Sequence, residues 1–163
     1  MYTNKSLEAL DKAEKSYVFD SISQDICLQL GQKLVSDAKS FEDRPLAVRV
    51  ILDDTIVFQY LMNGTGADNI RWMDRKCATV MRTGHCSLRR AVLNELEGKT
   101  EPWMADEFHY AFCGGAFPLK VNGVLRGIAC VSGLPHLRDH KRLSDTLAAF
   151  LGKESIAVPV DEQ

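Results

Sequence analysis

Residues 108–135 read FHYAFCGGAFPLKVNGVLRGIACVSGLP, and this stretch decides the fold. Asn122-Gly123 separates two apolar runs, 117–121 and 124–132, and favours the type I′ turn of a tight β-hairpin because both residues tolerate positive φ. The second run is apolar at successive positions, which is typical of a strand covered on both faces. The stretch therefore predicts a hairpin whose second strand is fully buried.

A second hairpin is predicted nearer the N-terminus, where the β-branched runs 46–52 and 56–62 flank Asp53-Asp54-Thr55. Helices are predicted from apolar periodicity and capping residues: one runs from the N-cap Ser23 to Ala38, and others cover residues 69–83, 88–96 and 139–151. The order helix, hairpin, helices, hairpin, helix predicts an α+β fold of two layers. Both hairpins join one antiparallel sheet, and the helices pack on it.

The length and charge of the chain limit its class. Its 163 residues suit one ordinary domain, so we expect a single domain over residues 1–163. A formal net charge of −2 gives no reason to expect nucleic acid or an anionic membrane surface as a partner. No apolar run approaches the roughly 20 residues of a membrane span, and the first residues lack the apolar core of a signal peptide.

The cysteines predict the redox compartment. None of the five forms a Cys-x-x-Cys pair: Cys27, Cys77, Cys86, Cys113 and Cys130. An odd count without a signal peptide indicates reduced thiols and a cytoplasmic protein. We therefore expect Cys113 to be a free, partly shielded thiol that is not bonded to Cys86.

Several short motifs carry a family resemblance. They are Gly114-Gly115-Ala116-Phe117-Pro118, Val131-Ser132-Gly133-Leu134-Pro135 and Asp139-His140, with a second block at Trp72, Arg75-Lys76 and Gly84-His85-Cys86-Ser87. Together they resemble the haem-degrading domain family, the group around the GlcG and HbpS proteins, and look closest to its uncharacterised UPF branch. The resemblance covers a core of about residues 20–152. It implies a profilin-like antiparallel sheet of about five strands, homo-oligomers, and haem as a candidate cofactor.

One position departs from the family pattern. The branch usually has histidine where this chain has Cys113. We therefore assign no axial haem ligand and no cofactor. Haem is expected to bind weakly at best, although a thiolate can ligate haem iron.

The candidate ligand-binding residues come from both family-matching blocks, so we expect them to meet in space. They are Arg75, Arg82, His85, Ser87, Cys113, Gly114 and Gly115. Bent glycine backbone can present free N–H groups, and arginine offers a planar fork of donors, so the set suits a small anionic ligand. The alternative is that the arginines form a solvated face or pair with acidic residues across an oligomer contact.

Three other interpretations of single residues stay open. His85 with a cysteine could form a nucleophile pair, and no catalytic residue is assigned because no group that orients the imidazole is evident. His136 and His140 stand four apart and could hold a metal on a helix, although Pro135 suggests that the helix barely begins there. The aromatic residues near the central hairpin could flank a flat ligand, but packing is their commoner use.

Three functions compete. The favoured hypothesis is a non-enzymatic oligomeric module that binds a small ligand near the Gly114-Gly115 loop. The second is an enzyme that degrades haem or acts on a small organic acid, and it should gather titratable residues with shifted pKa values in one cleft. The third is a protein-binding scaffold, which should expose a large apolar patch.

Self-association is the expected partnership, as a homodimer at least. The second arm of the central hairpin is apolar on both faces, whereas one layer of helices covers only one face of a sheet. A second copy of the chain would cover the other face by an isologous contact near Gly114-Gly115.

Overall fold

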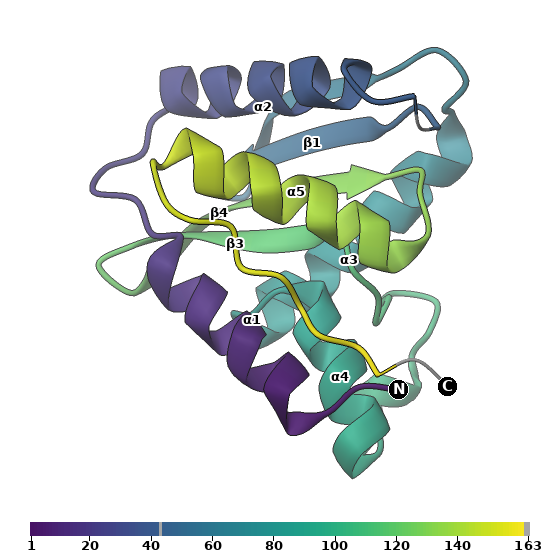
Figure 1. Cartoon of the computed structure of the whole chain (residues 1–163). Coiled ribbons are helices and arrows are strands. Elements are labelled where there is room, and N and C mark those ends of the chain that lie inside the picture. The colour runs from purple at the N-terminus through teal and green to yellow at the C-terminus, as the bar shows by residue number, and fades with distance from the viewer. Residues whose placement is uncertain (43, 162–163) are drawn as a thin grey trace.

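The computed structural model describes residues 1–42 and 44–161, and Figure 1 shows their arrangement. In chain order the elements are α1 (Asn4–Ser16), α2 (Gln24–Lys39), β1 (Ala47–Leu52), β2 (Thr55–Leu61), α3 (Ala67–Thr83), α4 (Ser87–Glu97), the 3₁₀-helix η1 (Pro102–Ala105), β3 (Ala116–Val121), β4 (Val124–Ser132) and α5 (His136–Phe150). None of these helices is both long and apolar enough to cross a membrane, among the residues described.

The sheet confirms both predicted hairpins. Its strand order is β2-β1-β4-β3, and every neighbouring pair is antiparallel. Asn122 and Gly123 have φ of 50° and 75°, as a type I′ turn requires. The sheet has four strands rather than the predicted five or so, because beside β3 only a single parallel bridge forms, between Phe19 and Val121.

Helices cover both faces of the sheet, which corrects the expected two layers. In Figure 1, α2 and α5 lie in front of the strands and α3 lies behind them. The front core includes Leu30, Phe117 and Leu147, and the rear core includes Met73 and Ile128. The second face of β4 therefore packs on α3, so our argument that only another subunit could cover it is wrong.

The two ends of the chain pack together below the sheet. Helix α1 lies against α4, with Leu10 and Ala13 fully buried. The Tyr17 hydroxyl donates to the Glu154 carbonyl and accepts from the Ile156 amide, at 3.2 and 2.8 Å. These bonds hold the segment after α5, residues 154–161, along α1 (Figure 1).

Candidate functional site

A buried ion pair joins the helices on opposite faces of the sheet. Lys76 Nζ of α3 lies 2.9 Å from Asp139 Oδ2 of α5, and the two side chains are only 3% and 2% exposed. Lys76 Nζ also donates to the Val131 carbonyl at 3.1 Å, and the Leu134 amide donates to Asp139 Oδ1 at 2.9 Å. These hydrogen bonds offset the cost of taking both charges out of water.

The Asp139 carboxylate keeps Lys76 protonated at neutral pH, so the buried pair joins a cation to an anion and has no net charge. Burial by itself would lower the pKa of Lys76, but the Asp139 carboxylate outweighs it, and the pKa of Lys76 is raised. Burial raises the pKa of Asp139, while Lys76 and backbone N–H groups stabilise its carboxylate form. Asp139 also lies in the first turn of α5, where the helix dipole favours a negative charge.

The Gly114-Gly115 loop packs directly over this pair. A Cβ on Gly114 would lie 2.3 Å from the His136 carbonyl oxygen, and one on Gly115, whose φ is +128°, would lie 2.6 Å from Lys76 Nζ. The Gly114 amide donates to His136 Nδ1 at 3.2 Å. That amide is therefore engaged inside the protein, whereas the sequence had predicted free N–H groups for a ligand.

Two adjoining cavities open beside the loop. The first, which we call the loop cavity, has a volume of about 440 Å³ and is lined by Trp72, Lys76, Cys113, His136 and Asp139, among others. The second, the outer cavity, has a volume of about 470 Å³ and shares Trp72, Cys113 and His136 with it. The outer cavity adds Tyr2, Arg75 and aromatic residues.

Arg75 contributes a guanidinium group to the outer cavity. Its guanidinium carbon lies 4.7 Å from the centre of the Trp72 ring, and one of its terminal nitrogens donates to the Glu107 carbonyl. Its Nε is buried and has no hydrogen-bond partner among the described residues. Arg75 therefore keeps one unused donor beside an aromatic face.

Burial shifts the pKa values of three further groups here. It raises the pKa of Tyr2 to about 12, raises that of the Cys113 thiol and lowers that of His136. The Tyr2 hydroxyl lies 3.4 Å from His136 Nε2. At neutral pH the site therefore presents a protonated thiol, a neutral imidazole and a neutral phenol next to the Lys76–Asp139 pair.

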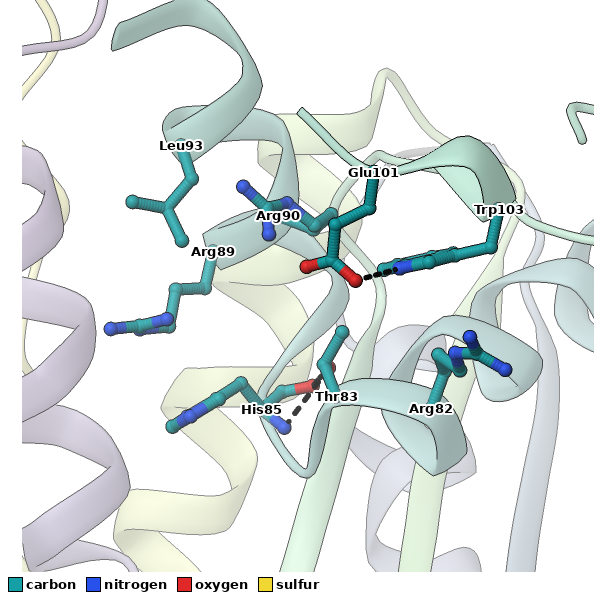
Figure 2. A pocket seen from close by; sticks show the side chains of 8 residues that line it. All are labelled: Arg82, Thr83, His85, Arg89, Arg90, Leu93, Glu101 and Trp103. Atoms are coloured by element: carbon teal, nitrogen blue, oxygen red, sulfur yellow. Dashed lines mark hydrogen bonds between the residues drawn. The ribbon is translucent and has the colours of Figure 1, made fainter. Parts of the chain in front are cut away.

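The structure divides the predicted ligand-binding residues into two groups. Arg75 and Cys113 line the outer cavity, while Arg82 and His85 line a separate cavity of about 240 Å³ (Figure 2). Gly114 and Gly115 line neither; they are buried against His136 and Lys76. Ser87 belongs to neither group. Its buried Oγ accepts from the Ala116 amide at 3.1 Å, so it holds the start of β3.

The cations of the separate cavity do not converge on a common point. Figure 2 shows Arg89 and His85 directed toward α1, where Arg89 Nε lies 2.7 Å from Asp11 Oδ1 and His85 Nδ1 lies 2.7 Å from Glu14 Oε2. The Arg82 guanidinium lies 5.3 Å from the Trp103 ring centre. His85, Arg89 and Arg82 are thus already engaged, whereas the Nε of Arg90, the fourth cation of this cavity, is buried without a hydrogen-bond partner among the described residues.

The proposed cysteine and metal sites gain no support from the geometry. His85 bonds Glu14 rather than a cysteine, and burial holds the pKa of Cys86 well above its usual range. Helix α5 begins at His136, so His136 and His140 do share a helix, but His140 is buried near Phe117. Residues 1–42 and 44–161 contain no group of three or more histidine, cysteine or acidic side chains placed to hold a metal.

The sequence interpretation missed the Lys76–Asp139 pair as part of a site. Both residues belong to the family-matching motifs, but neither was assigned to a binding or catalytic site. One signal was present: Lys76 stands three residues after Met73 and four before Val80, on the apolar stripe of α3. A lysine on such a stripe is rarely buried unless it is paired.

Removing one partner of the buried pair should destabilise the fold. Lys76→Met leaves the Asp139 carboxylate buried without a counterion, so we expect the free energy of unfolding to fall by about 3–5 kcal/mol. Urea denaturation at pH 7 measures the loss. The double variant Lys76→Met/Asp139→Leu is the control and should recover most of it, because no charge then stays buried. Equal losses in the single and double variants would contradict this account.

Comparisons with known proteins agree on the family. The family model described as haem degrading protein HbpS-like matches residues 22–148. UPF0303 proteins of Schizosaccharomyces pombe and Brucella ovis are each 32% identical, over 157 and 151 residues, and cover 91% and 90% of this chain and 87% and 88% of their own.

Solved structures show the same fold. The Ybr137w protein has a TM-score of 0.79 at 27% identity, with 90% of this chain and 88% of that chain covered. PduOC, solved as a complex with heme, has a TM-score of 0.68 at 17% identity, with 79% and 94% covered. By its matched residues and its UPF0303 relatives, this chain belongs to the HbpS-like family of haem-degrading proteins.

Proposed function

We propose that the chain is a non-enzymatic ligand-binding module that takes up a small organic anion in the joined loop and outer cavities. The observation that carries this proposal is the convergence of Lys76, Arg75 and Trp72 on cavities that also share His136 and Cys113. The Lys76 ammonium is already neutralised by Asp139, so the Arg75 guanidinium supplies the positive charge that would attract the anion. The unused Arg75 Nε is a donor for a carboxylate, and the Trp72 ring is a face for a flat ligand body.

The direction of the pKa shifts favours binding over catalysis. A general acid or base works best when its pKa lies near the operating pH. Around these cavities the pKa values of Tyr2, Lys76 and Cys113 are raised and that of His136 is lowered, so all four move away from neutrality. Only the pKa of Asp139 moves toward it, and that carboxylate is ion-paired with Lys76.

A panel of small carboxylates tests the proposed ligand class. Benzoate and short dicarboxylates, screened by thermal shift at pH 7, should include at least one that raises the melting temperature in a saturable way. Arg75→Ala should weaken that ligand by about 10- to 100-fold, since a hydrogen bond to a charged group is worth about 1.5–3 kcal/mol.

Arg82→Ala is the matched control for this test. It removes the same side chain from the same helix, but on the side of the other cavity (Figure 2). It should leave the affinity unchanged. Equal losses in the two arginine variants, or no shift with any carboxylate, would overturn the proposed site.

Haem is the second candidate ligand, and a specific residue favours it. A cavity of about 840 Å³ adjoins Arg75 and Trp72 and is also lined by His109 and Tyr110. His109 Nδ1 lies 2.7 Å from Asp106 Oδ2, and a histidine held in this way directs its Nε2 outward as a metal ligand. His136 fits haem poorly, because its Nδ1 accepts the Gly114 amide and its proton therefore sits on Nε2.

Of the described residues, His109 is the one that would hold haem iron, and the Arg75 guanidinium in the same cavity would pair with a propionate. Haem would supply an iron with an open coordination position. In a hemin titration followed at the Soret band, we expect weak binding with a shift that His109→Ala abolishes and His136→Ala preserves. A shift that depends on Cys113 and not on His109 would show that a thiolate is the ligand instead.

We also propose that the chain self-associates. The reason is now its exposed aromatic side chains, not an uncovered face of the sheet. Phe108 is 88% exposed and Trp72 is 39% exposed, and both border the same cavity. A second copy of the chain that covers this surface would shield both side chains. Light scattering at micromolar concentration should give a mass of at least two 18.2 kDa chains, and Phe108→Ser should shift it toward one. A single-chain mass for the wild type would refute self-association.

A further inference from the structure

Another cavity lies under the C-terminal segment, away from the site described above. It has a volume of about 220 Å³ and is enclosed by α4, α5 and residues 156–160. Its walls are largely apolar and include Leu88, Leu137 and Val158. We call it the strap cavity, because residues 154–161 cross it as a strap bonded to α1.

Two polar side chains on the wall of the strap cavity are left without partners. His140 and Ser144 stand four residues apart on α5, so they share one face of the helix. Both residues are buried, at 3% and 2% exposure, and both line the cavity. Within residues 1–42 and 44–161, both ring nitrogens of His140 lack a hydrogen-bond partner, and so does the Ser144 hydroxyl.

Such groups need an occupant of the cavity. A buried donor or acceptor without a partner costs about 1–3 kcal/mol, and native proteins avoid it unless water or a ligand supplies the bond. The cavity is larger than the roughly 30 Å³ that one water takes up in the liquid, and its apolar walls offer further waters few hydrogen bonds. An occupant with an apolar body and one polar end would satisfy both parts of the wall.

The polar end should be uncharged. Burial lowers the pKa of His140 to about 4, so its imidazole is neutral at pH 7 and both donates and accepts. Three charged side chains also line the cavity, Arg138, Lys141 and Asp145, and each already has a partner: Lys141 bonds Asp145, which also accepts from the Ser155 hydroxyl, and Arg138 is engaged as well. A charged head placed beside His140 and Ser144 would meet no free counterion there and would lose its hydration.

We propose that the strap cavity is a binding site for a small neutral amphiphile, an aliphatic molecule with a hydroxyl or amide head that bonds His140 and Ser144. The site is independent of the proposed carboxylate site, because the strap cavity shares no lining residue with the loop cavity or the outer cavity.

Nitrogen NMR of the histidine ring tests this assignment on the full chain. Protein labelled with ¹⁵N-histidine is titrated at pH 7 with 1-hexanol, and separately with hexanoate, which has the same carbon chain and a charged head. We expect the ring signals of His140 to shift saturably with 1-hexanol, and hexanoate to bind at least about tenfold more weakly.

Two serine substitutions provide the matched variants. Ser144→Ala removes the hydroxyl in the cavity and should weaken 1-hexanol by about three- to tenfold, the value of one neutral hydrogen bond. Ser40→Ala removes an exposed hydroxyl at the end of α2 that does not line the cavity, and it should leave the affinity unchanged. The proposal is overturned if the His140 signals do not move or move without saturation, which is the result for a cavity that holds water alone. It is also overturned if hexanoate binds as well as 1-hexanol, or if Ser40→Ala matches Ser144→Ala.

Discussion

The buried contact between Lys76 and Asp139 is the constraint on which the rest of the structure depends. It is the point at which a helix behind the sheet reaches a helix in front of it. The Lys76 side chain extends past the end of β4 toward Asp139, and its ammonium also donates to the Val131 carbonyl. A charge pair without water is stable only with this complete set of hydrogen bonds, so the ends of α3, β4 and α5 must keep their relative positions.

The Gly114-Gly115 loop follows from that contact. The backbone there must pass between Lys76 and the first turn of α5, and a side chain at either glycine would meet the ammonium group or the His136 carbonyl. The loop in turn places Cys113 and His136 at the mouth of the joined cavities. The site therefore lies beyond the end of the sheet, where α3 and α5 from its opposite faces meet. A ligand bound there can contact both helices.

The two proposed binding sites suit different ligands because the ionisable groups around them differ in charge state. Near the loop, the Asp139 carboxylate keeps Lys76 protonated, and the Arg75 Nε has no partner among the described residues. Under the strap, burial keeps His140 neutral, and its ring nitrogens have no partner in the described part of the chain. A carboxylate suits the first environment and a neutral head suits the second, for the same electrostatic reason.

The sequence by itself determined the features that depend on local geometry. Asn122-Gly123 predicted its turn, the β-branched runs predicted both hairpins, and Ser23 predicted the start of α2, where its hydroxyl accepts the Ile26 amide. The motifs around Gly114 and Gly133 also identified the family that the comparisons confirm. Each of these follows from residues close together in the chain.

Only the tertiary structure decided which residues meet. Periodicity shows that a helix has an apolar stripe but not which face of the sheet it covers, so the place of α3 behind β4 could not be predicted. Lys76 and Asp139 lie 63 positions apart, and no spacing rule connects them. Arg75 and Arg82 share a stripe of α3, yet seven residues of helix separate them by about 10 Å. That length places the two arginines at different cavities, because a small ligand cannot span it.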